Sequence, residues 1–230
     1  MDQMKRFAVY YAPEKGAFEA RASAWLGWDT GAGRPLAQPD LGLPGGTGAA
    51  EITRDPGRYG FHGTIRAPFR LAEGSTPAAL KAALEDLARR LPPVTLPGLR
   101  LVALDGFLAL IPEGDPAALQ ALAARVVEET NPFRAALTAD ETARRRPERL
   151  TPRQRALLDL WGYPFVMEEF RFHLTLTDRL DPAQADEVAR ILAAHFAPVL
   201  PRPFTIDSLC LFGEAEDGRF HLLHRFSLHG

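Results

Sequence analysis

Two short phrases in this sequence carry a histidine and a threonine separated by a single residue. They read Phe61-His62-Gly63-Thr64 and Phe172-His173-Leu174-Thr175. An imidazole titrates near pH ~6.5, so at neutral pH one ring can accept a proton while another donates one. A threonine hydroxyl can donate a hydrogen bond to the oxygen of an anion. These residue types together predict acid–base chemistry on a phosphate.

The two histidines divide the proton transfers of such a reaction between them. A neutral imidazole removes a proton from the attacking hydroxyl or water, and an imidazolium protonates the leaving oxygen, each role being worth ~10²–10⁴-fold in rate. His62 and His173 are therefore the candidate catalytic residues, with either ring in either role. Because no carboxylate stands beside them, as a hard cation would need, we expect no metal and no cofactor.

Both phrases alternate as β-strands do. Residues two apart share a face of a strand, so His62 lies on one face with Thr64 and Arg66. The matching row of the second strand comprises Arg171, His173, Thr175 and Thr177. Two such rows facing each other predict a cleft rich in hydrogen-bond donors, in which hydroxyls and guanidinium groups stabilise the charge that builds on the phosphate.

The elements around the two phrases follow the same order. Residues 59–111 and 170–228 each read strand, helix, strand, turn, strand, which predicts an internal repeat within a single bilobal domain, 1–230, of the α+β class. The expected strands are residues 7–11, 59–69, 99–103, 107–111, 170–177, 204–212 and 220–228. The expected helices are residues 18–28, 76–90, 115–130, 152–162 and 182–196.

The overall composition is that of an ordinary globular protein. Apolar residues make up 46% and charged residues 24%, and the formal net charge is −2, which gives no support to a protein that wraps nucleic acid. No stretch approaches the ~20 apolar residues of a spanning helix, and no signal segment is evident, so we expect a cytoplasmic protein without membrane contact. The single cysteine, Cys210, excludes an intramolecular disulfide.

The two histidine phrases resemble the signature of the 2H phosphoesterase superfamily. The wider segments 58–71 and 162–177 resemble its DUF1045-type branch, which is found near bacterial phosphonate-utilisation genes. The resemblance implies a pseudo-twofold bilobal fold, with two small antiparallel sheets, helices outside and a central cleft. It also implies that His62 and His173 catalyse the reaction while Thr64 and Thr175 contact phosphate.

Fewer observations support the remaining candidate substrate-binding residues. Arg66, Arg171, Tyr59 and Tyr163 belong only to the branch-like segments, and Thr177 only to the polar row of its strand. His221 and His224 are three apart in an expected strand and point to opposite faces, which argues against a metal site.

Two further segments have no assigned role. Residues 30–48 are rich in glycine and proline and predict a long loop, which lacks the lysine of a nucleotide-binding P-loop. The basic run at residues 144–155 is either a solvated face or a lid that reaches a second anionic group of the substrate.

Three functions remain open. The first is a metal-independent hydrolase that acts on a small cyclic or linear phosphodiester, with a place in phosphonate or ribose-phosphate metabolism. The second is a non-catalytic module that binds a phosphorylated metabolite. The third is a 2′,3′-cyclic phosphodiesterase acting on RNA ends, which needs a positive track and is not favoured by the charge balance. The oligomeric state is left open.

Overall fold

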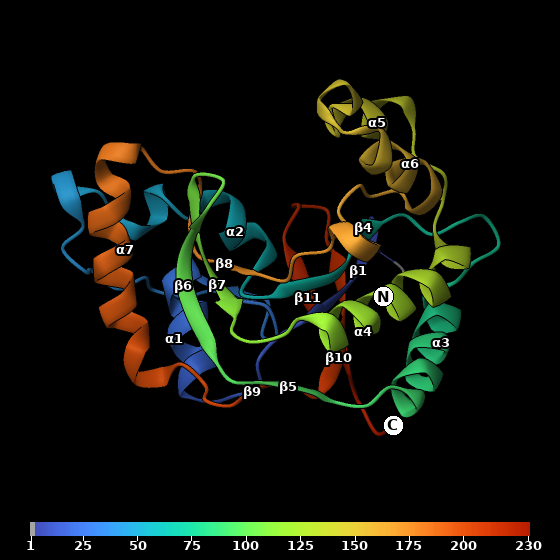
Figure 1. Ribbon diagram of the computed structural model, residues 1–230, viewed down its shortest axis with the longest axis horizontal. Helices are drawn as coiled ribbons and strands as arrows, with labels where there is room; N and C mark the ends of the chain where they lie inside the picture. Colours follow the sequence, from blue (N-terminus) through green and yellow to red (C-terminus); the bar gives the residue numbers. More distant parts are fainter. Residues whose placement is uncertain (1–2) are drawn as a thin grey trace.

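The computed structural model describes residues 3–230, arranged as two halves around one central sheet (Figure 1). The strands are β1 (Arg6–Tyr11), β2 (Trp28–Asp29), β3 (Arg34–Pro35), β4 (Gly63–Phe69), β5 (Val94–Leu96), β6 (Leu99–Leu104), β7 (Phe107–Pro112), β8 (Leu174–Thr175), β9 (Phe204–Ile206), β10 (Ser208–Glu214) and β11 (Phe220–Ser227). The helices are α1 (Ala17–Leu26), α2 (Arg54–Tyr59), α3 (Pro77–Arg90), α4 (Ala117–Thr130), α5 (Ala139–Arg144), α6 (Pro152–Trp161) and α7 (Pro182–Phe196). The expectation of an α+β fold is confirmed.

The main sheet differs from the expected pair of separate sheets. Seven strands form one sheet in the order β11-β10-β1-β4-β8-β7-β6, and every pairing within it is antiparallel. The two halves of the sheet join at β4 and β8, where Gly63 and Leu174 are the one pair in register. The absence of a side chain at Gly63 permits this junction, because an added Cβ would lie 2.2 Å from Cζ of Phe172.

The chain exchanges hairpins between the two halves of the sheet. The element order β4-α3-β5-β6-β7 is followed later by β8-α7-β9-β10-β11. The first strand of each series lies in the half of the sheet that holds the hairpin of the other series. Strand β4 is thus in the half with β1, β10 and β11, while β8 is in the half with β7 and β6. The division into repeat units at residues 59–111 and 170–228 stays a prediction.

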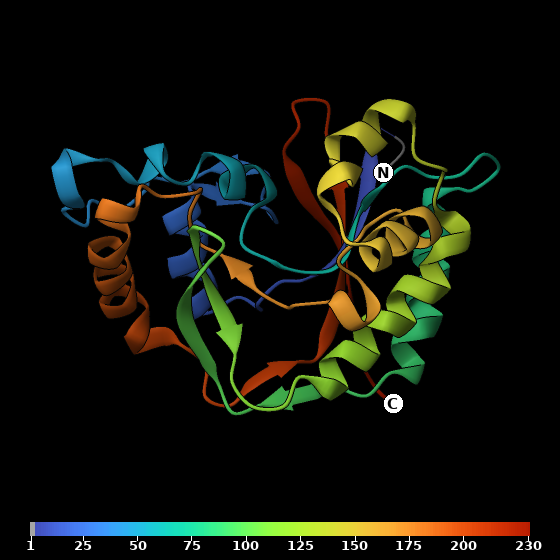
Figure 2. The same ribbon diagram turned by 45° about the horizontal axis from the view of Figure 1, so that its top comes forward.

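Helices pack on each half of the sheet (Figure 2). Helices α3 and α4 pack against each other, with α3 against β10 and β11 and α4 against β4, while α7 packs against β6 and β7. Both α3 and α7 begin with a side-chain cap followed by proline: Thr76 accepts from the backbone N–H of Ala79 at 3.1 Å, and Asp181 from that of Ala183 at 2.9 Å. No described helix is both long and apolar enough to cross a lipid bilayer.

The segments before the two histidines differ from the expected strands. Residues 54–59 form α2, which ends at Gly60 with a φ of 72°, and β4 begins only at Gly63. In the second copy, regular strand is limited to Leu174–Thr175. Helix α2 depends on a partner distant in sequence, since the carboxylate of Asp178 accepts hydrogen bonds from the backbone N–H groups of Arg54 and Asp55, each at 3.0 Å. Local sequence patterns do not reveal such a partner.

Candidate functional site

The junction of β4 and β8 brings the two histidine phrases together. Because Gly63 and Leu174 face each other in an antiparallel pair, His62 stands across from Thr175, and Thr64 stands across from His173. Neighbouring residues of a strand point to opposite faces. These four side chains therefore share one face of the sheet, and the side chain of Leu174 lies on the other. The phrases are thus related by a local twofold arrangement.

The two imidazoles are held in the same way. Nδ1 of His62 lies 2.8 Å from the carbonyl oxygen of Gly60, and Nδ1 of His173 lies 2.8 Å from that of Arg171. A carbonyl only accepts, so each Nδ1 carries the proton and donates it. In the neutral form of each ring Nε2 is therefore the basic nitrogen. Nε2 of His62 lies 3.2 Å from Oγ1 of Thr64, whose hydroxyl donates to it.

The surroundings of His62 favour its neutral form. The ring of Tyr10 stacks on it with centroids 3.9 Å apart and planes inclined by 25°. Removal from water lowers the pKa of His62 to about 4, against the opposing effect of the Gly60 carbonyl, and the charge of His173 lowers it further. His62 is therefore neutral at pH 7, with Nε2 unprotonated and accepting from the hydroxyl of Thr64.

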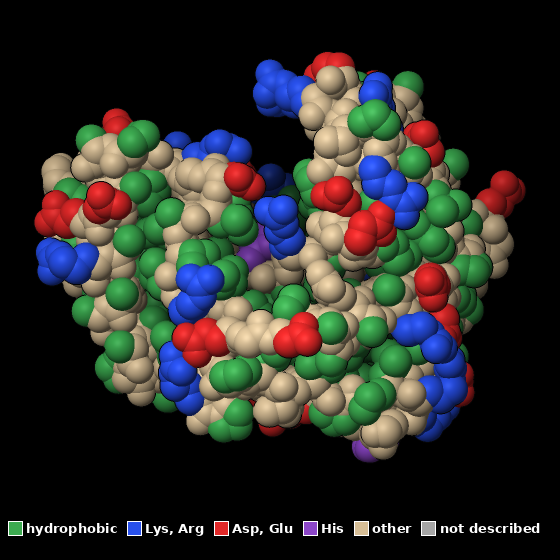
Figure 3. Space-filling model, in the orientation of Figure 1, with side chains coloured by type: hydrophobic (Ala, Val, Ile, Leu, Met, Phe, Trp, Pro, Cys, Tyr) green, Lys and Arg blue, Asp and Glu red, His purple; other side chains and the backbone are tan. Residues whose placement is uncertain are grey.

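The motif residues border two adjoining cavities. His62, Thr64 and Thr175 line a cavity of about 360 Å³, the motif cavity, while His173 lines a neighbouring cavity of about 460 Å³, the apolar cavity. Thr64, Ala67, Phe107 and Tyr163 line both. The apolar cavity is also lined by Leu104, Phe165, Val166 and Phe170. These side chains make a wall suited to a flat organic group. Figure 3 shows a histidine at the floor of a hollow between the two halves.

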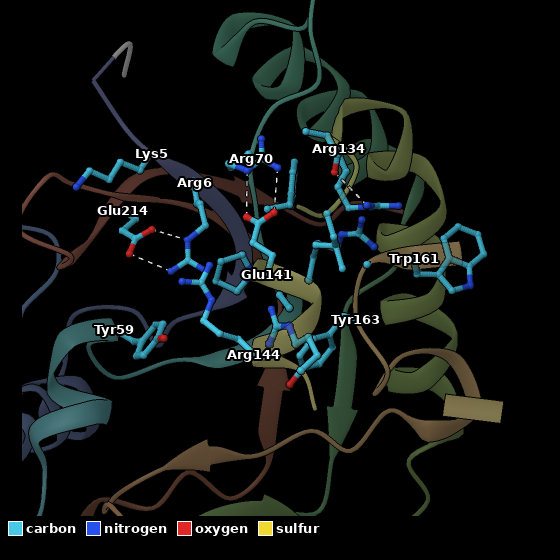
Figure 4. Close-up of a pocket in the computed structure, with 18 of the residues that line it drawn as sticks. Lys5, Arg6, Tyr59, Arg70, Arg134, Glu141, Arg144, Trp161, Tyr163 and Glu214 are labelled. Atoms are coloured by element: carbon cyan, nitrogen blue, oxygen red, sulfur yellow. Dashed lines mark hydrogen bonds and ion pairs between the residues drawn. The ribbon is translucent and has the colours of Figure 1, made fainter. Parts of the chain in front are cut away.

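A third cavity, of about 510 Å³, is lined by many cations and is called here the arginine cavity (Figure 4). Its cationic residues are Lys5, Arg6, Arg58, Arg66, Arg70, Arg134, Arg144 and Arg145. Ala67 and Tyr163 line all three cavities, so the arginine cavity adjoins the site of the two histidines.

Arg66 does not join the row of His62 and Thr64, which corrects the expectation from simple alternation. The register of β4 against β1 shifts by one residue between Thr64 and Arg66, so the alternation of faces is interrupted there. Arg66 is 1% exposed and lines the arginine cavity, where its Nη2 donates to Oδ1 of Asn131 at 3.1 Å.

The other candidate residues lie at different depths. Tyr59 lines the motif and arginine cavities, and Tyr163 all three cavities, while the exposed Arg171 lines the apolar cavity. Thr177 lines the motif cavity but is 1% exposed, and its Oγ1 accepts from the backbone N–H of Leu108 at 2.9 Å. The hydroxyl of Thr177 is therefore bonded to the backbone of β7, although the residue also lines the motif cavity.

Several residues of the site had no signal in the sequence analysis. Tyr10 lies on the strand expected at residues 7–11, but only the pairing of β1 with β4 places its ring on His62. Arg6, Arg58 and Arg134 lie far apart in the sequence, and their convergence depends on tertiary structure. Within residues 3–230, no group of three or more His, Cys, Asp or Glu side chains is arranged to hold a metal ion.

Comparison with solved structures finds full-length but distant similarities. The TT0787 protein of Thermus thermophilus is 16% identical with a TM-score of 0.47, covering 98% of both chains. A structure of Escherichia coli LigT complexed with NADP+ is 17% identical with a TM-score of 0.43, covering 99% of both chains.

Two curated relatives are more similar in sequence, and both are named ribose 1,5-bisphosphate phosphokinase PhnN. The one from Janthinobacterium sp. (strain Marseille) is 38% identical over 223 residues, which cover 94% of this chain and 49% of that protein. The one from Laribacter hongkongensis (strain HLHK9) is 40% identical over 218 residues, 93% of this chain and 49% of that protein. The chain thus spans about half the length of these relatives.

One family model matches the chain across most of its length. The family is described as "Protein of unknown function (DUF1045)", and the match covers residues 64–221, from Thr64 of the first phrase to beyond the second. This chain belongs to the DUF1045 family.

Proposed function

We propose that this protein is a phosphoesterase that hydrolyses a small cyclic or linear phosphodiester through His62 and His173. The observation that carries the proposal is the pairing of Gly63 with Leu174 at the junction of β4 and β8, beside which His62, Thr64 and Thr175 line the motif cavity and His173 lines the adjoining apolar cavity. The matched bonds from Nδ1 to backbone carbonyls support it, because they leave Nε2 of each ring as the nitrogen that exchanges a proton with the substrate.

The environment of His62 suits it to the role of general base. Neutral Nε2 removes a proton from water as the water oxygen bonds to phosphorus. The pKa of about 4 makes the free ring a weak base, but the negative phosphate beside it raises that pKa when substrate binds.

His173 takes the role of general acid. As the bond from phosphorus to the leaving oxygen breaks, protonated Nε2 of His173 gives its proton to that oxygen, leaving a phosphomonoester and a free hydroxyl. Once Nε2 of His62 has taken the proton of water, the hydroxyl of Thr64 no longer donates to that nitrogen, and together with the hydroxyl of Thr175 it donates to the non-bridging oxygens as their charge grows. Exchange with solvent then returns both imidazoles to their starting states.

The named relatives favour a sugar phosphate as the substrate. They carry the name of an enzyme that acts on ribose 1,5-bisphosphate, and this chain matches about half of each. We propose that the substrate is a ribose phosphate or a compound related to it, in phosphonate or ribose-phosphate metabolism, and that the protein acts in the cytoplasm without a cofactor. The apolar cavity beside His173 accommodates the organic part of the leaving group.

Hydrolysis of 2′,3′-cyclic AMP in the presence of a chelator tests the proposal. His62→Ala and His173→Ala are each expected to lower kcat by about 10²–10⁴-fold, because each removes one proton-transfer group. His229→Ala, at an exposed position outside the three cavities, is the matched control and should retain wild-type rates.

Two outcomes would contradict the catalytic role. Full turnover in both motif variants would remove the histidines from the mechanism. Thermal stabilisation of the wild type by cyclic phosphates without any turnover would instead indicate a module that only binds phosphorylated metabolites.

A further inference from the structure

The arginine cavity carries far more positive than negative charge. It is lined by eight cationic side chains and by two carboxylates, Glu141 and Glu214. Each carboxylate is held by one arginine: Nη2 of Arg6 lies 2.9 Å from Oε1 of Glu214, and Nη2 of Arg70 lies 2.9 Å from Oε2 of Glu141. The dashed lines in Figure 4 mark these pairs. Within residues 3–230, no salt bridge joins Arg58, Arg66, Arg134, Arg144 or Arg145 to a carboxylate.

Arg66 is the member of this group that most needs an anion. It is 1% exposed, and its Nη1 has no hydrogen-bond partner in the described part of the chain. A buried guanidinium with an unpaired N–H donor is costly, because that donor has lost its hydration, and the bond from Nη2 to Asn131 leaves Nη1 without an acceptor in the described part of the chain. Burial, together with the nearby charge of Arg134, lowers the pKa of Arg66 to about 9. A bound anion would supply the missing acceptor.

The remaining wall comes from a separate part of the chain. Helix α5 and the turn after it contribute Arg144 and Arg145, and Arg145 lies over the ring of Tyr163 at 4.8 Å from its centroid. These arginines belong to the basic run at residues 144–155, whereas Arg149 in the same run is exposed and lies outside the cavity. The run is therefore divided between residues that border the cavity and residues that face solvent.

The arginine cavity shares part of its wall with the motif cavity. Arg6, Tyr59, Ala67, Pro68, Arg145 and Tyr163 line both. A molecule with its diester beside His62 can therefore extend past Tyr163 into the cationic space without leaving the protein surface.

We propose that the arginine cavity binds a second phosphate of the same substrate, so that the substrate class is a phosphodiester carrying a separate phosphomonoester group. This inference rests on the proposed function for the placement of the diester. The cavity offers the monoester, which bears up to two negative charges, several guanidinium donors able to form paired hydrogen bonds to phosphate oxygens.

Binding of a matched pair of probes to the His173→Ala variant tests the inference independently of turnover. The probes are 2′,3′-cyclic AMP and its 5′-phosphorylated counterpart, with affinities measured by titration calorimetry at low ionic strength. The 5′-phosphorylated probe is expected to bind at least about tenfold more tightly, because charge-assisted hydrogen bonds to a phosphate are worth about 1.4 kcal/mol or more.

Additional substitutions in the His173→Ala background locate the effect. Arg66→Gln and Arg144→Gln should each reduce the preference, and Arg144→Gln keeps the test valid if the buried Arg66→Gln fails to fold. Arg149→Gln, from the same basic run, should preserve it. Equal affinities for the two probes, no binding of either, or a preference that persists in Arg144→Gln would overturn the second phosphate site. If the His173→Ala variant prefers the 5′-phosphorylated probe but the wild type hydrolyses neither probe, the second phosphate site is supported and the phosphoesterase proposal is refuted.

Discussion

The two histidines have matched hydrogen bonds but different surroundings. Each Nδ1 donates to a carbonyl two residues earlier in the chain, which leaves Nε2 of each as the reactive nitrogen. His62 is covered by Tyr10, whereas the one aromatic pair of His173 within residues 3–230 is with the tilted ring of Phe107, with centroids 5.7 Å apart. This difference in cover, rather than the motif itself, distinguishes the proposed base from the proposed acid.

The half-buried position of His62, beneath the ring of Tyr10, predicts a dependence of stability on pH. Its pKa is about 4 in the folded protein and about 6.5 in the unfolded chain, so the unfolded chain binds more protons between these values. The contribution of His62 is therefore fully favourable above pH 6.5 and is lost as the pH falls toward 4, by on the order of 2 kcal/mol.

The test compares the wild type with His62→Gln by urea unfolding at pH 7 and pH 4.5. The substitution should reduce the loss of unfolding free energy on acidification, because glutamine does not titrate. An unchanged loss in His62→Gln would show that the ring of His62 does not cause it. His229→Gln, at an exposed position outside the motif cavity, serves as the control.

At the residue scale, the sequence predicts the motif rows but not all their neighbours. Alternation places His62 with Thr64, as found across the β4–β8 junction, because a strand keeps a period of two over short stretches. The same rule fails for Arg66, since the register shift that interrupts β4 depends on pairing with β1. The stacking of Tyr10 likewise requires the order of strands in the sheet.

At the element scale, the segment after β8 supports the segment before β4. The carboxylate of Asp178 accepts from two backbone N–H groups at the start of α2, and that helix ends directly before Gly60, whose carbonyl orients His62. Asp178 therefore ties the second phrase to the histidine of the first.

Asp178→Ala is expected to lower both stability and activity. Loss of a capping carboxylate costs about 1–2 kcal/mol, and here it also frees the segment that orients His62. Asp181→Ala is a matched control, because Asp181 caps α7 in the same manner away from the motif cavity. Thermal melts should show similar losses for the two variants, while kcat falls only in Asp178→Ala. Equal kcat values for the two would contradict a positioning role.

Other elements show where local patterns are sufficient. Helices α3 and α7 begin at the proline that follows a Thr or Asp cap, as expected from short-range signals. The expected strand at residues 204–212 is instead divided into β9 and β10, which pair with β5 and β1 respectively. The point at which the chain passes from one sheet to the other is determined by the strands it pairs with, and a local sequence pattern does not contain that information.

At the scale of the whole molecule, the exchanged hairpins make the two halves of the chain dependent on each other. A cut after Ala136, an exposed residue between α4 and α5, separates β1 and β4 from β10 and β11, and β8 from β6 and β7. Each piece would expose unpaired strands and the apolar face that the other covers.

Fragments 1–136 and 137–230 are therefore expected to be unfolded or aggregated when produced singly and to form a folded complex when produced together. Circular dichroism and size-exclusion chromatography of each fragment and of the mixture check this expectation. A cooperative thermal transition in either isolated fragment would contradict the dependence.

The exchange also leaves the two motif strands with unlike neighbours. Strand β8 lies directly beside the hairpin strand β7, whereas β1 stands between β4 and β10. Because Tyr10 belongs to β1, its ring covers the imidazole of the first phrase, while the second phrase lies beside β7 instead. The strand that breaks the symmetry of the sheet therefore also makes the two imidazoles unequal.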